Sequence, residues 1–124
     1  MELIKSHKEL KVYQKAFSNA MEIFQLTKGF PKEETYSLIS QIRRSSRSVN
    51  GNIAEAFRRR QYPKSFVSKL SESESEAAET QNWLDFSLAC QYIAPEKHCI
   101  LNEEYDNIIG MLVNMQKNPE KWTI

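Results

Sequence analysis

The segment from Pro31 to Arg60 constrains this chain more than any other, because it reads as one long helix with two chemically opposite faces. At about 100° per residue, one side gathers apolar and small residues: Ile39, Ile42, Ser46, Val49, Ile53 and Phe57. The opposite side gathers Arg43, Arg44, Arg47, Arg58 and Arg59, with Glu55 among them. A helix of this kind has to bury its apolar stripe against other elements, which favours a helical bundle.

Three further segments repeat the helical spacing and predict buried seams. Their residues are Leu10, Tyr13, Phe17, Ala20 and Phe24; then Phe66, Leu70, Ser73, Ala77, Thr80, Leu84 and Ser87; and finally Leu101, Tyr105, Ile108, Leu112 and Met115. Pro31, Pro63 and Pro95 each stand where a new helix would begin, a position that tolerates proline because its N–H has no helical partner. Short connections force consecutive helices to run antiparallel.

These patterns predict an all-α protein, an up-down-up-down antiparallel four-helix bundle. Residues 1–124 form a single domain, with helices at about 8–28, 32–60, 63–92 and 95–116. The chain carries three glycines and four prolines, little material for many tight turns. It has no 18-residue apolar run and no signal-like start, so a cytoplasmic protein without a membrane partner is expected. Cys90 and Cys99 are expected to be free, partly buried thiols.

The arginine-rich face is the main functional candidate. The formal net charge of the chain is only +1, so any attraction for nucleic acid has to come from clustering. Guanidinium groups bind phosphates through two charge-assisted hydrogen bonds. The nucleic-acid-binding candidates are Arg43, Arg44, Arg47, Arg58, Arg59, Arg60 and Lys64. The alternative is a solvated or salt-bridged face without a ligand.

A second set of residues favours self-association. Gly51 inside a helix costs about 1 kcal/mol relative to alanine, which close approach of a neighbouring subunit would explain. The interface candidates are Gly51, Ala54, Glu72, Glu76, Glu79, Trp83 and Phe86. The acidic stripe of helix 63–92 and the basic stripe of helix 32–60 could meet head to tail and close a ring. In the other interpretation, Trp83 is buried within its own bundle and the arginines stay exposed.

Catalytic chemistry is not predicted. A di-iron site in a helical bundle requires Glu-x-x-His motifs, and neither His7 nor His98 has a glutamate three residues earlier. The sequence contains no glycine-rich phosphate loop and no nucleophile elbow. We therefore expect a protein that is not an enzyme and has no metal and no cofactor.

Helix 32–60 also carries a family resemblance. The Pro-Lys-Glu-Glu start, the Ser-Gln-Ile-Arg-Arg block at 40–44 and Asn-Ile-Ala-Glu at 52–55 resemble proteins encoded in intervening sequences of bacterial 23S ribosomal RNA genes. Glu-Thr-Gln at 79–81 is a weaker match, and Ala56 replaces the usual glycine. The resemblance implies a four-helix bundle assembled as a ring-like homopentamer. It also implies kinship with accessory proteins of diversity-generating retroelements, which bind nucleic acid and partner a reverse transcriptase.

The leading hypothesis is a non-enzymatic oligomeric bundle that binds RNA or DNA, or a nucleic-acid-processing protein, through its arginine face. The alternative is a structural scaffold or interaction adaptor. In that case the arginines form subunit contacts, or the Trp83–Phe86 surface binds another protein.

Overall fold

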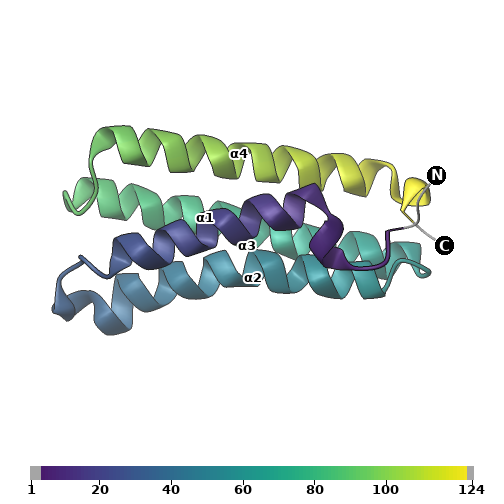
Figure 1. Ribbon diagram of the computed structural model, residues 1–124, viewed down its shortest axis with the longest axis horizontal. Helices are drawn as coiled ribbons and strands as arrows, with labels where there is room; N and C mark the ends of the chain where they lie inside the picture. The colour runs from purple at the N-terminus through teal and green to yellow at the C-terminus, as the bar shows by residue number, and fades with distance from the viewer. Residues whose placement is uncertain (1–3, 123–124) are drawn as a thin grey trace.

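The structure is a computed structural model that describes residues 4–122, and four long helices dominate it. They are α1 (Lys11–Thr27), α2 (Ser40–Arg58), α3 (Pro63–Ala89) and α4 (Pro95–Lys117). Short turns η1 (His7–Glu9), η2 (Lys32–Glu34), η3 (Thr35–Ile39) and η4 (Pro119–Lys121) flank them, and residues 4–122 contain no strand. Consecutive helices run in opposite directions, and α4 returns beside α1 (Figure 1). The prediction of an all-helical chain with four helices is confirmed.

Local chemistry sets where the helices begin and end. Pro63 and Pro95 occupy the first positions of α3 and α4. The start of α1 is later than the pattern indicates, because Ser6 and Glu9 form a capping box around η1 and Leu10 is extended. Likewise, residues 32–39 form a 3₁₀ turn and a π turn before α2 starts at Ser40. After α3, Gln91 takes a positive φ of 64°, which reverses the chain toward α4.

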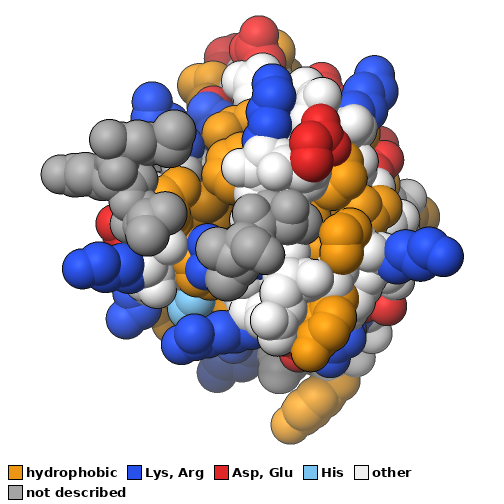
Figure 2. All heavy atoms as spheres, turned by 90° about the vertical axis from the view of Figure 1, so that its right-hand side faces the viewer, with side chains coloured by type: hydrophobic (Ala, Val, Ile, Leu, Met, Phe, Trp, Pro, Cys, Tyr) orange, Lys and Arg blue, Asp and Glu red, His pale blue; other side chains and the backbone are white. Residues whose placement is uncertain are grey.

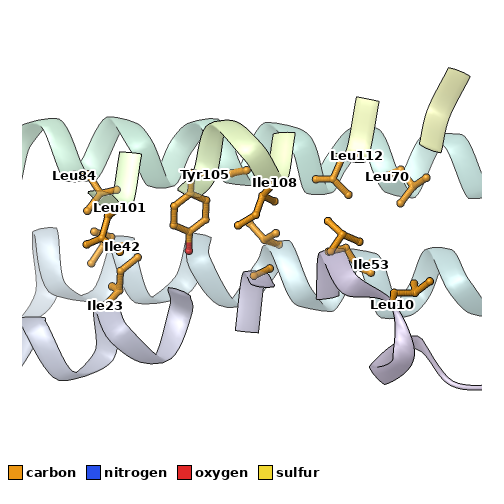
Figure 3. Packing of buried hydrophobic residues seen from close by; sticks show 14 of the residues in the cluster. Leu10, Ile23, Ile42, Ile53, Leu70, Leu84, Leu101, Tyr105, Ile108 and Leu112 are labelled. Carbon is orange, nitrogen blue, oxygen red and sulfur yellow. The ribbon is translucent and has the colours of Figure 1, made fainter. Parts of the chain in front are cut away.

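The core lies along the bundle axis and follows the predicted seams of α2, α3 and α4. Every residue named for those three seams is buried. Leu84 and Leu101, from α3 and α4, meet Ile42 and Ile23, from α2 and α1 (Figure 3). The helical periodicity of apolar and small residues in the sequence therefore identifies the inward face of these three helices.

The seam predicted for the first helix is wrong, apart from Leu10. The buried residues of α1 are Val12, Ala16, Asn19, Ile23 and Thr27, whereas Phe17 is 52% exposed. Polar Asn19 and Thr27 interrupt the true stripe, yet both are satisfied: Asn19 Nδ2 donates to Lys15 O at 2.9 Å and Thr27 Oγ1 to Ile23 O at 2.9 Å. The more aromatic stripe instead faces the side where α1 adjoins α2.

Small residues let α2 and α3 make the most extensive helix contact of the bundle. Ser73 Oγ donates to Val49 O at 2.8 Å, and Thr80 Oγ1 donates to Ser45 Oγ at 2.8 Å. Ala77 lies between these two bonds along α3 and is fully buried. The two backbones therefore approach closely, and this fixes the position of the arginine face of α2 relative to α3.

An ion pair between α1 and α4 gives the fold a pH dependence. Lys15 Nζ lies 2.8 Å from Glu104 Oε2, and Asn19 Nδ2 lies 3.3 Å from Glu104 Oε1. Hydrogen bonds from Lys15 and Asn19 hold the pKa of Glu104 below its ordinary value. Because the folded-state pKa is lowered, this stabilisation is complete above the unfolded pKa of about 4.3 and is lost as pH falls through the folded pKa.

Glu104→Gln is expected to lower the free energy of unfolding by up to about 1 kcal/mol at about pH 7, since the pair is partly exposed. As the pH falls below about 4.3 and through the lowered pKa of Glu104 in the folded protein, the difference between wild type and variant is expected to disappear. Urea unfolding over a series of pH values measures the difference. A gap between the two proteins that persists unchanged in acid would contradict this role of the carboxylate.

Candidate nucleic-acid interface

The structure separates the predicted basic residues into groups that point in different directions. Arg44 reaches toward α3, and Arg43 and Arg47 reach toward α1. Arg58, Arg59, Arg60 and Lys64 lie at the turn between α2 and α3, at the end of the bundle. The arginine face is thus not one continuous strip of equivalent cations.

Arg44 is paired within its own chain. Its Nη1 lies 2.9 Å from Glu76 Oε2, and its Nη2 lies 2.5 Å from Glu79 Oε2. Hydrogen bonds to Glu79 and Glu76 raise the pKa of Arg44. Two carboxylates therefore compete with any phosphate for this guanidinium, and Arg44 is the weakest nucleic-acid candidate of the set.

Arg43 and Arg47 gather with Lys28 around the ring of Phe24. The guanidinium carbons of Arg43 and Arg47 lie 4.8 and 5.7 Å from the ring centroid, and Lys28 Nζ lies 4.8 Å from it. Arg43 Nε also donates to Thr27 Oγ1 at 2.8 Å, which ties it to the end of α1. None of these cations forms a salt bridge within residues 4–122. We call Lys28, Arg43 and Arg47 the Phe24 cation cluster.

Arg60 turns back onto the fold. Its guanidinium carbon lies 3.6 Å from the centroid of the Phe57 ring, and its Nε donates to Phe57 O at 2.9 Å. It also donates to Ile4 O at 3.4 Å, so it connects the N-terminal segment to the end of α2. Partial burial, followed by the charge of Arg58, lowers the pKa of Arg60. These contacts leave the guanidinium of Arg60 less available to a ligand than the exposed arginines beside it.

The remaining cations form an exposed basic end. Arg58, Arg59 and Lys64 are exposed and make no salt bridge in the part of the chain that the structure describes. His7 joins Arg58 and Arg59, together with Glu55, around a shallow pocket of about 410 Å³, and Lys8 next to His7 is exposed. Figure 2 views this end and shows Lys and Arg side chains around its rim, with a histidine among them. We call Arg58, Arg59, Lys64, His7 and Lys8 the basic end.

His7 and Lys8 were missed as site residues because they lie about fifty positions before Arg58 in the sequence. One signal could have found them. In an antiparallel bundle with short connections, the start of the first helix lies beside the end of the second. A basic segment just before α1 is therefore placed next to basic residues at the end of α2.

The predicted interface residues are also engaged inside the chain. Glu72 and Glu55 both bind Lys69 Nζ, at 3.0 and 2.9 Å, while Glu76 and Glu79 share Arg44. Across the α2/α3 surface, four carboxylates thus form salt bridges with two cations, and the charge of Arg59 also acts on Glu55. Trp83 packs partly buried against the core. Phe86 is 53% exposed, with its ring centroid 5.8 Å from that of Trp83.

Comparison with known proteins gives the family. The sequence profile of 23S rRNA-intervening sequence proteins matches residues 8–114. The chain belongs to this family. A crystal structure of a protein of unknown function from the S23 ribosomal protein family of Bacteroides thetaiotaomicron is similar, with 31% identity and a TM-score of 0.77. The match covers 86% of this chain and 95% of that chain. No curated protein matches this chain.

The resemblance inferred from the second helix is therefore confirmed, and neither the family nor the solved relative is described with an enzymatic activity.

Residues 4–122 contain no group of three or more His, Cys, Asp or Glu side chains arranged to hold a metal ion. Cys90 and Cys99 are free and exposed, which corrects the expectation of partial burial. Within the same residues, none of the helices combines the length and apolar character needed to span a bilayer.

Proposed function

We propose that this protein is a non-enzymatic, cytoplasmic helical bundle that self-associates and binds RNA or DNA through the phosphate backbone. The single observation that carries the proposal is the contrast within the arginine face. Arg44 is neutralised by two glutamates, whereas Arg58, Arg59 and Lys64 stay exposed without a salt bridge among residues 4–122. The basic end is therefore the proposed contact surface.

The chemistry of the basic end suits phosphate better than it suits a base edge or a small molecule. Guanidinium and ammonium groups on a convex end can follow a backbone without reading its sequence. Arg58 and Arg59 also stand at the C-terminus of α2, where the helix dipole stabilises cations. A single basic end is a weak binding site. A homo-oligomer would present several basic ends and bind with avidity, and the family resemblance implies a homopentamer.

Arg58→Glu is expected to weaken nucleic-acid binding at least about tenfold at low salt, because one phosphate contact becomes a repulsion. The matched control is Lys32→Glu, which makes the same change of charge on an exposed residue at the opposite end of the bundle. Binding of a labelled single-stranded RNA and of duplex DNA is measured by fluorescence anisotropy over a series of salt concentrations.

For wild type bound to a single strand, three phosphate contacts predict a slope of log K against log salt of about −2 for each engaged subunit. Arg58→Glu is expected to reduce the magnitude of that slope by about 0.7, and Lys32→Glu to leave it unchanged. If both variants lost the same amount of nucleic-acid affinity, the effect would come from the net charge of the protein, and the basic end would be rejected as the binding site. Absence of binding by wild type at low salt would reject the proposed function.

A structural scaffold or adaptor is the second candidate, in which the cations serve contacts between proteins, including a nucleic-acid-processing partner. The observation that favours it is the exposed apolar stripe of α1, with Phe17 at 52% and Met21 at 45% exposure. Apolar patches of this kind mark protein interaction sites. If wild type assembles but binds no nucleic acid, this candidate takes precedence.

A further inference from the structure

A row of aromatic rings starts at the basic end and continues along the first turns of α1. The ring of His7 meets that of Tyr13 at a centroid distance of 4.7 Å, and the stacked rings of Tyr13 and Phe17 have centroids 6.1 Å apart. Tyr13 packs partly buried against the core, whereas Phe17 is 52% exposed. We call His7, Tyr13 and Phe17 the aromatic row. Its last member therefore offers an aromatic ring to solvent.

Two hollows in the surface border Tyr13 and Phe17. One, of about 440 Å³, is lined by these two rings together with Lys8 and Gln14. The other, of about 370 Å³, lies between α1 and α2, and its further lining residues are Ala20, Met21, Arg47, Asn50, Gly51 and Ala54. Ala54 also borders the pocket of His7, Arg58 and Arg59 at the basic end. The hollows share residues, and together they form a strip that we call the aromatic strip.

The aromatic strip can accept a flat apolar group. A Cβ added at Gly51 would meet no atom within 4 Å, so this position of α2 is open toward the hollow. The rest of that lining is mostly apolar. A ligand that covers it with a planar ring removes this surface from water, which is favourable.

Cations lie at both ends of the aromatic strip. The basic end provides one group, and exposed Arg47 lines the hollow between α1 and α2 at the other. The Arg47 guanidinium carbon lies 5.7 Å from the Phe24 ring centroid, and Arg47 forms no salt bridge among residues 4–122. Glu55 borders the strip as well, but Lys69 Nζ lies 2.9 Å from its Oε2 and offsets its charge. The strip thus combines cations at its ends with exposed rings between them.

Hydrogen bonds within the chain fix this surface. Asn50 Nδ2 donates to Tyr13 O at 3.0 Å, which holds α2 against the aromatic row. Gln14 Nε2 donates to Lys8 O at 2.9 Å, which holds the segment before α1 against the helix. A surface that is already ordered loses less conformational freedom when a ligand binds.

We propose that the aromatic strip binds single-stranded nucleic acid. A base stacks on Phe17, and the basic end and Arg47 hold the phosphates on either side. The inference rests on the proposed binding of nucleic acid and names the form that is bound, an unpaired strand. Proteins that bind single strands without reading their sequence combine a basic groove with aromatic side chains on which bases stack. The bases of a duplex are covered by their neighbours, so only an unpaired base has a face free for Phe17.

The length of the strip suits a short stretch of strand. Arg58 follows Arg47 by about 16 Å of helix rise, and the aromatic row lies beside this part of α2. Arg43, one turn further, is tied to α1 because its Nε donates to Thr27 Oγ1 at 2.8 Å. The bound stretch therefore ends at Arg47. It corresponds to the lower part of the range of about 4 to 16 nucleotides found for single-strand sites.

The first test uses wild type alone and compares two strands that carry the same phosphates. One is an oligouridine of about ten nucleotides, and the other is a strand of equal length built only from abasic sites. Wild type is expected to bind the oligouridine at least about fivefold more tightly, because only that strand has bases to stack. Fluorescence anisotropy at low salt measures both affinities.

The second test asks whether Phe17 is the stacking residue. Phe17→Leu keeps an apolar side chain but removes the ring, and it is expected to lower the ratio of the two affinities at least about threefold. Phe17→Tyr keeps a ring and is expected to restore the ratio. Phe86→Leu is the matched control, since Phe86 is 53% exposed on α3 and lies outside the strip. Because each ratio compares two strands on one protein, effects of net charge or of assembly cancel.

A third measurement tests the far end of the strip. For an oligouridine that reaches Arg47, this residue adds one phosphate contact to the three of the basic end. Arg47→Gln is therefore expected to reduce the magnitude of the slope of log K against log salt by about 0.7. Lys32→Gln removes the same charge from an exposed residue outside the strip and is expected to leave the slope as in wild type.

The outcomes separate this inference from the proposed function. If wild type bound neither strand at low salt, nucleic-acid binding itself would be rejected. If wild type bound both strands equally, the stacking site would be overturned while phosphate binding by the basic end stood. A ratio that Phe17→Leu left unchanged, or that Phe86→Leu lowered equally, would overturn Phe17 as the stacking residue. A slope that Arg47→Gln left unchanged would overturn the strip as far as Arg47.

Discussion

Ala77→Leu is expected to lower the free energy of unfolding by about 3 kcal/mol or more, while Ala78→Leu is expected to change it by less than about 0.5 kcal/mol. Ala77 is fully buried where α3 crosses α2, whereas Ala78 is exposed, so the two substitutions add the same atoms to opposite environments. Overpacking of a tight core costs about 1 to 3 kcal/mol. Here the larger side chain would also push α3 away from α2 and weaken the hydrogen bonds of Ser73 and Thr80 to α2. Each of these hydrogen bonds contributes about 1 kcal/mol.

Urea unfolding of both variants, followed by circular dichroism, measures the difference. A loss of this size is a large part of the typical total stability of about 5 to 15 kcal/mol, so we expect Ala77→Leu to unfold at a clearly lower urea concentration than wild type. If Ala77→Leu were as stable as Ala78→Leu, the result would contradict the close approach of α2 and α3. It would also contradict the pairing of Arg44 with Glu76 and Glu79, which depends on that approach.

Two substitutions of Tyr105 are expected to change stability in opposite directions. Tyr105→Ala is expected to cost about 4 kcal/mol, as for other large aromatic truncations in a core. Tyr105→Phe is expected to stabilise the protein by about 1 kcal/mol, because it removes a buried hydroxyl that has no hydrogen-bond partner within residues 4–122. The Tyr105 side chain is fully buried at the centre of the bundle (Figure 3), and that burial raises the pKa of its phenol.

Tyr36→Phe is the control, since Tyr36 is 94% exposed and its hydroxyl is solvated. Thermal and urea unfolding of the three variants test the expectation. Destabilisation by Tyr105→Phe would mean that the hydroxyl is hydrogen-bonded in solution, for instance by a buried water molecule.

The candidate site could be predicted in part. The helical periodicity of the sequence predicts the clustering of arginines on one side of helix 32–60, and it places Gly51 away from the core. The sequence does not predict which of these arginines have partners within the chain, because those partners lie far away in the sequence. Arg44 meets Glu76 and Glu79 at separations of 32 and 35 residues, and Arg60 meets Ile4 at a separation of 56.

Three features follow from the order of the residues alone: the inward faces of α2, α3 and α4, the proline starts of α3 and α4, and the family motif in the second helix. Each depends on spacing within a single helix, where the 3.6-residue period places residues on one face whatever the rest of the chain does. Family membership was equally local, since the block at 40–44 and Asn-Ile-Ala-Glu at 52–55 lie in one segment.

Which of the two stripes of α1 is buried depends on how the four helices pack against one another. Hydrophobicity alone favours the stripe with Tyr13, Phe17 and Phe24, yet the bundle buries the one with Asn19 and Thr27. Those polar groups find partners in Lys15, Glu104 and the helix backbone once α1 packs against α4, so their burial is compensated. Packing volume and long-range hydrogen bonds settle such a choice, and neither is a property of one helix.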